Sequence, residues 1–222
     1  MKESVVPAPW QLQGDGYIFL LKNDKELGRK DAHIPPALLD HYQGGLNVLM
    51  YVRYSASSVG PYNELLYIPG LFDFPNGRTD RSITRIYVDS TASLIGGRAN
   101  WGIPKELADF SLSKDGSELS VSVSVKGEPA TAFAMKNFGP SLPVSTRFVP
   151  KGLRTLSQLY NDTLYTFALS GKGRMRFASL EPKFTSARLF PDLMERRVLA
   201  GVYIEGFEIE FPVAKRLEHK IL

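Results

Sequence analysis

Alternation of apolar and polar residues is the strongest structural pattern along this chain. The clearest run, LSVSVSV at positions 119–125, places valines on one face and serines on the other, which is typical of a half-buried β-strand. Other segments are rich in the aromatic and branched apolar residues that strands favour. Together these patterns predict strands at Tyr17–Leu21, Leu46–Tyr54, Glu64–Ile68, Ile83–Val88, Asp109–Ser113, Glu118–Lys126, Ala130–Lys136, Thr163–Leu169, Gly173–Ser179 and Val198–Phe211.

Few segments have the features of helices. Pro36–Tyr42 begins with proline, a favourable first helical residue, and Pro191–Arg197 is a second short candidate. A third helix is expected from an N-cap at Ser90 to a stop at Gly96-Gly97, which leaves Arg98–Lys105 as a loop. Strands outnumber helices, and no βαβ alternation or internal repeat is recognised. The chain therefore predicts one domain over residues 1–222 with a mainly β, antiparallel, barrel-like fold and a few short helices.

Composition and charge narrow the classes of partner. Hydrophobic residues make up 43% of the 222-residue chain and charged residues 23%, the balance of an ordinary globular domain. The net charge is +4, but the basic residues are dispersed among acidic ones, so no nucleic-acid surface is expected. The chain has no cysteine, which excludes disulfides, zinc-thiolate sites and thiol nucleophiles. No apolar run is long enough to span a membrane, and the expected location is the cytoplasm.

Several common chemistries have no motif in this sequence. His33, His41 and His219 lack a second ligand at helical spacing, so no metal site is predicted. The glycines at 14–16 and 171–173 lack the third glycine and following helix of a dinucleotide site, and no G-x-S-x-G elbow occurs. Lysine chemistry remains, because a neutral amine attacks a ketone to give an iminium, which is an electron sink for the neighbouring carbon.

A family resemblance singles out one lysine. The segment Ile83–Ala108, ITRIYVDSTASLIGGRANWGIPKELA, is similar to the part of acetoacetate decarboxylases that runs from a strand through a Gly-Arg pair to a Pro-Lys element. Val48–Glu64 and Gly14–Leu21 resemble the family's approach to an active-site glutamate and its first strand. The resemblance implies that Lys105 forms the Schiff base and that Glu64 is the active-site glutamate. It also implies that no added cofactor is needed and that the chain assembles into a homo-oligomer.

The residues around Lys105 suit this role. Pro104 fixes its own φ and biases the preceding residue towards an extended conformation, so the lysine is presented from a stiff segment beside Trp101, and an apolar setting desolvates an amine. Glu64 shuttles a proton or orients the substrate, or else forms an ordinary salt bridge with Arg98. Arg98 in turn binds a substrate carboxylate or anchors the loop.

Departures from the family pattern bear on the substrate. Glu106 follows the Schiff-base lysine where decarboxylases carry a second lysine, Asp15 aligns with a first-strand arginine, and Leu49 aligns near a further carboxylate. A nearby carboxylate favours the protonated amine, and the loss of a cation weakens capture of an acidic substrate. Adjacent residues on an extended segment point to opposite sides, so Glu106 is expected to face away from the amine. Asp15 and Glu106 join Arg98 and Trp101 as candidate substrate-binding residues.

The sequence thus predicts an enzyme with a Schiff-base lysine that acts on a small keto compound less acidic than acetoacetate. Decarboxylation, aldol-type condensation with dehydration, and retro-aldol cleavage all pass through the same iminium, so the sequence does not choose among them. The alternative is a non-catalytic barrel that binds a small molecule and leaves Lys105 charged. Binding of RNA through the sheet is disfavoured because the aromatic signature of RNA-binding sheets is absent. Apolar residues at Phe207–Val213 and at 221–222 fit the expected homo-oligomer.

Overall fold

A computed structural model describes residues 4–22 and 25–218 of this protein. Its main element is a ten-stranded sheet in the order β8-β7-β4-β3-β1-β15-β14-β11-β10-β9. The bounds of these strands are β1 Trp10–Leu21, β3 Asn47–Ala56, β4 Tyr62–Ile68, β7 Arg85–Val88, β8 Lys105–Leu107, β9 Asp109–Asp115, β10 Glu118–Val125, β11 Glu128–Ser145, β14 Ser170–Thr185 and β15 Val198–Phe211.

A second sheet has six strands in the order β16-β13-β12-β6-β5-β2. Its strands are β2 Tyr42–Gly44, β5 Leu71–Asp73, β6 Thr79–Arg81, β12 Thr155–Tyr160, β13 Thr163–Ala168 and β16 Lys215–Glu218. The helices are α1 Lys25–Asp31, α2 Pro36–Leu39 and α3 Thr91–Trp101, with 3₁₀ turns η1 Thr146–Phe148 and η2 Lys151–Arg154.

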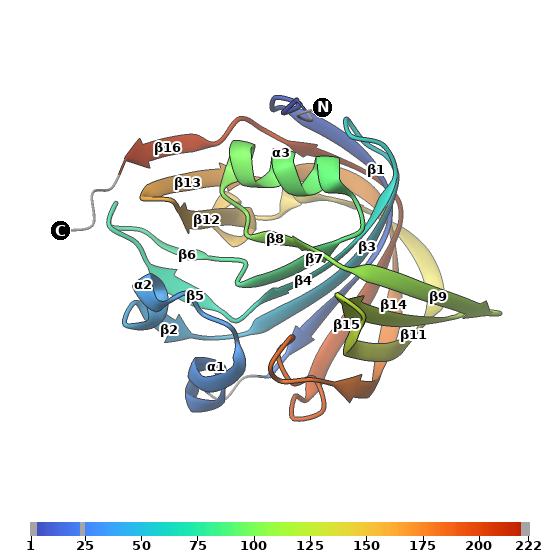
Figure 1. The fold of residues 1–222 in the computed structure, drawn as a ribbon. Coiled ribbons are helices and arrows are strands. Elements are labelled where there is room, and N and C mark those ends of the chain that lie inside the picture. The colour runs from blue at the N-terminus through green and yellow to red at the C-terminus, as the bar shows by residue number, and fades with distance from the viewer. Residues whose placement is uncertain (1–3, 23–24, 219–222) are drawn as a thin grey trace.

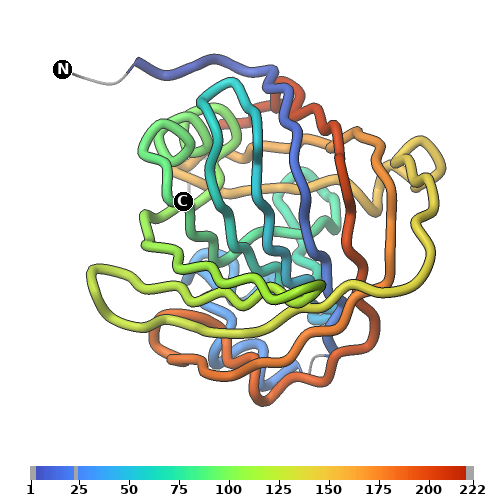
Figure 2. The backbone as a smooth tube through the Cα atoms, turned by 90° about the vertical axis from the view of Figure 1, so that its right-hand side faces the viewer, coloured from blue at the N-terminus to red at the C-terminus, as the bar shows by residue number. Residues whose placement is uncertain are grey.

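The large sheet is strongly curved. Figure 1 shows α3 lying across one end of it, with β12 and β13 behind the helix. Figure 2 shows the neighbouring strands β3, β1, β15 and β14 running side by side. The fold is mainly β and barrel-like with few helices, which confirms the predicted class.

Two separate apolar cores lie against opposite faces of the large sheet. Along β3, Leu49 and Tyr51 belong to one core, whereas Val52 and Tyr54 belong to the other. This division follows from the pleat, because successive side chains of a strand point to opposite faces. The second core also contains Trp101 of α3, and it surrounds the cavity described below.

The clearest strand pattern is confirmed. Val121 and Val123 are buried at 1% and 2% exposure, whereas Ser122 between them is exposed. β15 has the predicted bounds, Val198–Phe211. A period of two is a local property of the chain, so it is readable without knowledge of the partners of a strand.

The expected stop of the third helix is wrong. α3 continues through Gly96 to Trp101 and ends at Gly102, whose φ of 64° is left-handed. Gly96 is retained inside the helix because a Cβ there would lie 2.3 Å from Cζ2 of the Trp10 ring. The glycine therefore serves close packing and does not terminate the helix, so the first half of the expected loop, residues 98–101, is helical.

Three further expectations are corrected. Pro191–Arg197 forms no helix and is mostly irregular with one short turn, because the guanidinium of buried Arg196 is held by Tyr67 and Asp31. The expected absence of βαβ units is also wrong, since β7 and β8 are parallel neighbours with Ile86 opposite Lys105, and α3 connects them. The first predicted helix is shorter than expected and ends at Leu39.

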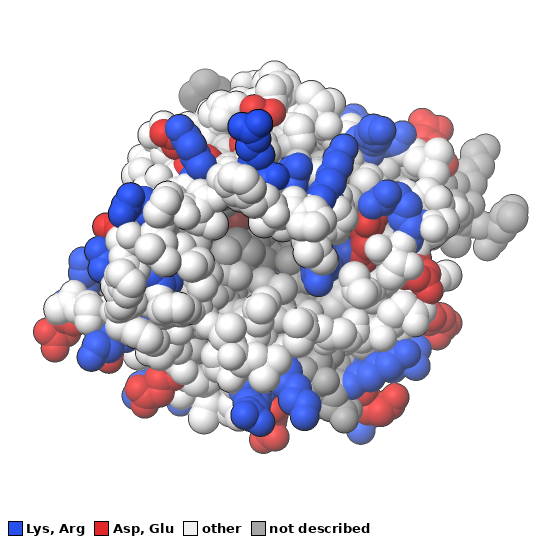
Figure 3. All heavy atoms as spheres, turned by 180° about the vertical axis from the view of Figure 1, so that it is seen from behind, with Lys and Arg blue, Asp and Glu red and all other residues white. Residues whose placement is uncertain are grey.

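The surface carries charges of both signs. Figure 3 shows Lys and Arg side chains interspersed with acidic ones around a hollow in the face turned away from the viewer of Figure 1. No helix in the described part of the chain is long and apolar enough to cross a membrane. Residues 4–22 and 25–218 contain no group of three or more potential metal-ligating side chains. His219 and the apolar pair at 221–222 lie outside the described residues.

Candidate active site

Lys105 is positioned by the βαβ unit. Ser90 caps α3 by accepting a hydrogen bond from the backbone of Ser93, and the helix then ends at Gly102. Pro104 leads directly into β8, whose first residue is Lys105. The parallel pairing of β8 with β7 fixes the register of the lysine. Its side chain is thereby directed beneath α3 and into the second core.

The Lys105 amine makes two short polar contacts in a buried setting. Nζ lies 2.7 Å from Oε2 of Glu64 and 2.9 Å from Oγ of Ser93. Lys105 is only 4% exposed and Glu64 only 3%. The amine also lies 5.1 Å from the centre of the Tyr62 ring. An ion pair so deep in an apolar core is costly to desolvate and depends on its hydrogen-bonding partners.

Glu64 is held from its other side by an aromatic pair. Tyr54 on β3 donates a hydrogen bond of 3.2 Å to Oε1 of Glu64. Tyr54 and Tyr62 are opposite each other in the β3–β4 register, with ring centres 4.5 Å apart. Burial, and then the charge of Glu64, raises the pKa of both tyrosines well above the usual value. Both hydroxyls therefore stay protonated and serve as donors at neutral pH.

Gly97 leaves room for the lysine. A Cβ at this position would lie 2.7 Å from Cδ and Cε of Lys105, closer than carbon atoms approach without displacement. Ser93 and Gly97 are four residues apart on α3 and so share one face of the helix. Ser93 contacts the amine of Lys105, and Gly97 leaves space for the alkyl chain that carries the amine.

The amine and the Glu64 carboxylate both line a cavity of about 90 Å³. Tyr54 contributes the third polar side chain, and the rest of the lining is aliphatic or aromatic, with one glycine, Gly16. The aliphatic wall includes Ile86 and Ile103 beside the lysine, and Leu156 from the second sheet. The cavity is small and apolar, with polar groups gathered around a single amine.

The four candidate substrate-binding residues lie outside this lining. Trp101 is buried in the core, where it donates from Nε1 to the carbonyl of Pro212 at 2.7 Å. Glu106 is paired with Arg85, on the opposite side of β8 from the Lys105 amine. Asp15 accepts a hydrogen bond of 2.9 Å from the backbone of Gly206.

Arg98 is on α3 and lines a separate surface hollow with Asp89 and Glu106. The alternative salt bridge between Glu64 and Arg98 is wrong, because Glu64 is bonded to Lys105 instead. Leu49 belongs to the core on the other face of the sheet. The structure thus brings Glu64 and Lys105 together and places the other site candidates elsewhere.

Four residues of the site were missed by the sequence reasoning, namely Tyr54, Tyr62, Ser93 and Gly97. A local signal existed for three of them, since Gly97 is the glycine of the resembled Gly-Arg pair. Tyr62 precedes Glu64 by two residues, so both face the same side of β4. Ser93 lies within the resembled segment, but the contact of its hydroxyl with the amine depends on the path of the chain through Gly102.

Comparisons with known proteins place the chain in a family. A model of the family described as acetoacetate decarboxylase (ADC) matches residues 31–159, which is more than half of the chain. The chain belongs to the acetoacetate decarboxylase family. Membership supports an enzyme of the lyase type in general. A search of curated proteins finds no match.

Solved structures share the fold at low sequence identity. The acetoacetate decarboxylase of Legionella pneumophila has a TM-score of 0.71 and 16% identity, covering 97% of this chain and 90% of that one. The enduracididine biosynthesis enzyme MppR, in complex with pyruvate, has a TM-score of 0.69 and 16% identity, covering 97% and 92%. An acetoacetate decarboxylase-like enzyme from Sphingomonas wittichii RW1 has a TM-score of 0.69 and 15% identity, covering 97% and 95%.

Proposed function

We propose that this protein is a Schiff-base-lysine enzyme that acts on a small keto compound, with Lys105 as the nucleophile and Glu64 as the proton carrier. The observation that carries the proposal is the Lys105–Glu64 contact of 2.7 Å inside an apolar cavity. A solvated surface lysine would be neither buried nor hydrogen-bonded to an equally buried carboxylate. The pyruvate complex of a fold neighbour agrees with a keto substrate.

The chemistry begins with a proton shift. Glu64 accepts a proton from the Lys105 ammonium, and the neutral amine adds to the carbonyl carbon of the substrate to give a carbinolamine. The same carboxyl returns a proton to the departing hydroxyl, so the carbonyl oxygen leaves as water and an iminium remains. The proton moves over a hydrogen bond of 2.7 Å, within the reach that general acid–base catalysis requires.

The iminium then takes up the electron pair of a broken bond at the neighbouring carbon. Loss of carbon dioxide, loss of a proton, or retro-aldol cleavage each gives the same enamine. The enamine is protonated or adds to a second carbonyl compound, and water hydrolyses the resulting iminium to release the product and the free amine. The hydroxyl of Tyr54 donates a hydrogen bond to the Glu64 carboxylate and so holds it in position during these steps.

The lining favours a weakly acidic substrate. Among the described residues, no cation apart from Lys105 itself lines the cavity, so a substrate carboxylate would be desolvated without a partner. A volume of about 90 Å³ limits the substrate to a small aliphatic ketone or a β-dicarbonyl compound. The alternative is the non-catalytic barrel, in which the ammonium of Lys105 stays paired with Glu64 and the cavity binds an apolar molecule.

Trapping with borohydride tests the proposal. The protein is incubated with butan-2-one or pentane-2,4-dione, reduced with sodium borohydride, digested and mapped by mass spectrometry. The expected result is a reduced adduct on the peptide that contains Lys105, absent in Lys105→Met and retained in Lys114→Met, which removes an exposed lysine. Labelling spread over surface lysines with none at Lys105 in the folded protein would favour the binding barrel.

A further inference from the structure

A hollow larger than the apolar cavity lies on the other side of the β12–β13 hairpin from it. Leu156 lines the cavity, whereas its neighbour Thr155 lines the hollow. The hollow has a volume of about 780 Å³, within the range of small-molecule sites. The turn between β5 and β6, the 3₁₀ turn η2, strand β13 and the segment 212–217 form its wall. We call it the basic groove.

The charge of the basic groove is of one sign. In the part of the chain that the structure describes, five cationic side chains line it and no Asp or Glu does: Arg78, Lys151, Arg154, Lys215 and Arg216. The basic residues are dispersed along the sequence, and the fold gathers these five from three separate segments. A concave surface lined by one sign of charge concentrates ions of the opposite sign.

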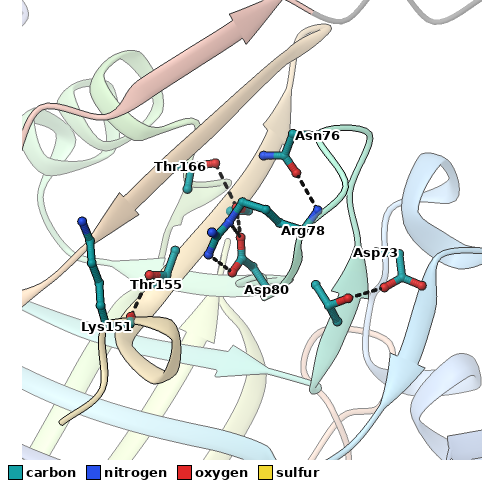
Figure 4. A network of polar contacts seen from close by, with 9 residues as sticks. Asp73, Asn76, Arg78, Asp80, Lys151, Thr155 and Thr166 are labelled. Carbon is teal, nitrogen blue, oxygen red and sulfur yellow. Dashed lines mark hydrogen bonds and ion pairs between the residues drawn. The ribbon is translucent and has the colours of Figure 1, made fainter.

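One of these cations is held rigidly. Arg78 donates from Nε and Nη2 to the two oxygens of Asp80, each at 2.7 Å. Asp80 is only 2% exposed and also accepts a hydrogen bond of 2.9 Å from Ser157. Figure 4 shows this pair together with Thr166 and the Thr155–Lys151 contact. The buried carboxylate thereby fixes one edge of the guanidinium and leaves Nη1 to engage a ligand.

A polar row leads from this pair across the sheet to a second cation. Ser157 is opposite Thr166 in the β12–β13 register, and Thr166 is opposite Lys215 in the β13–β16 register. Side chains opposite each other on neighbouring strands share a face. Lys215 therefore lies on the same face as the Arg78–Asp80 pair, with hydroxyl groups between them.

Four of the five cations have no acidic partner within the described residues, namely Lys151, Arg154, Lys215 and Arg216. Arg154 donates from Nη1 to the carbonyl of Leu169 at 2.6 Å. Because this carbonyl is neutral, the positive charge of Arg154 stays uncompensated. Cations without acidic partners stabilise an anion that binds among them. In the empty groove the same cations contribute less to the stability of the fold.

The groove also offers apolar surface. Val213 and Leu217 line it and are 66% and 49% exposed. Leu164 adds a buried apolar side chain to the floor. An inorganic ion would leave this surface in contact with water, whereas an organic group attached to the anion would cover it.

We propose that the basic groove binds an organic phosphate, with the phosphate held by Arg78, Lys151 and Lys215 and the organic part lying against Val213 and Leu217. Phosphate matches the site better than a monocarboxylate, because its double charge and three free oxygens engage several cations at once. The proposal is independent of the chemistry at Lys105, since the two hollows lie on opposite sides of β12 and β13.

Calorimetric titration tests the proposal with three probes: phenyl phosphate, inorganic phosphate and benzoate. Phenyl phosphate should bind saturably and more tightly than either of the other two, and its affinity should fall with added salt. The variant Lys151→Gln/Lys215→Gln should weaken phenyl phosphate binding about tenfold, because two exposed cations are lost. Its control, Lys114→Gln/Lys136→Gln, makes the same change of charge on exposed lysines of β9 and β11 and should leave binding within about twofold.

A third variant separates the organic part from the phosphate. Val213→Ser should weaken phenyl phosphate binding about threefold or more and leave inorganic phosphate unchanged. Lys105→Met, if folded, should bind phenyl phosphate as the wild type does, so failure at the groove and failure at Lys105 are told apart. The proposal would be overturned if phenyl phosphate does not bind saturably, or if both lysine double variants weaken its binding equally. It would also be overturned if Lys151→Gln/Lys215→Gln changes the oligomeric state and the protein does not bind phosphate.

Discussion

Removal of the Lys105 amine should destabilise the fold through the charge it leaves behind. In Lys105→Met the side chain keeps its length but loses Nζ, so Glu64, 3% exposed, keeps only the 3.2 Å hydrogen bond from Tyr54. Breaking a buried ion pair by removing one partner costs about 3–5 kcal/mol. For a chain of this size that loss lowers Tm by roughly 6–20 °C.

The double variant Lys105→Met/Glu64→Gln isolates the cause. It removes both charges while the amide oxygen introduced at position 64 still accepts from Tyr54, so most of the lost stability should return, leaving a deficit of about 1–2 kcal/mol. Urea unfolding of the four proteins of the cycle, followed by circular dichroism, measures the loss in the single variant and its recovery in the double variant.

A small loss of stability in Lys105→Met would refute this reasoning. If Lys105→Met unfolds within about 1 kcal/mol of the wild type, and the double variant is no more stable than the single one, the pair is hydrated in solution. The desolvated setting on which the proposed amine chemistry depends would then be absent.

Four other predictions concern separate parts of the molecule. Gly97→Ala should reduce borohydride trapping at Lys105 at least about tenfold, because its Cβ displaces the lysine chain; Gly96→Ala should cost stability at Trp10 but keep trapping in the folded fraction. The pKa of His33 is lowered to about 4, chiefly by burial and then by Arg85, so between about pH 6.5 and 4 only the unfolded chain binds this proton and stability falls as the pH drops. His33→Gln should therefore lose about 1 kcal/mol less than the wild type between pH 7 and 5 in urea unfolding, and an equal loss would contradict the assignment. Acetoacetate should be a poor substrate, and carbon dioxide release on the order of 1–10³ per second would show that reading to be wrong. The protein should be a homo-oligomer, and a monomeric mass by light scattering at low micromolar concentration would count against it.

Features of this molecule that depend on residues close together in the sequence are predictable from it, and features that depend on contacts between distant residues are not. β10 and β15 were found because alternation is local. α3 was cut short at Gly96 because the reason for that glycine, the Trp10 ring against it, comes from a distant strand. The helix predicted at Pro191–Arg197 is wrong for a similar reason, since the conformation of this segment depends on the burial of Arg196 against Tyr67 and Asp31.

The candidate site divides in the same way. The resemblance supplied Glu64 and Lys105 together, although nothing in their local patterns brings them within 2.7 Å. Ser93 and Tyr62 complete the surroundings of the amine, and neither residue type suggests such a role on its own. Their contribution depends on the turn at Gly102, which directs β8 beneath the helix.

The central claim is that Lys105 forms an iminium with a ketone inside the apolar cavity. Iminium formation expels the carbonyl oxygen as water, and hydrolysis restores it from solvent, so each cycle exchanges that oxygen. The direct measurement is the loss of oxygen-18 from labelled butan-2-one, followed by mass spectrometry. We predict saturable exchange above the buffer rate with the wild type and Lys114→Met, and the buffer rate with folded Lys105→Met. Exchange at the same rate with the wild type and Lys105→Met would contradict the claim.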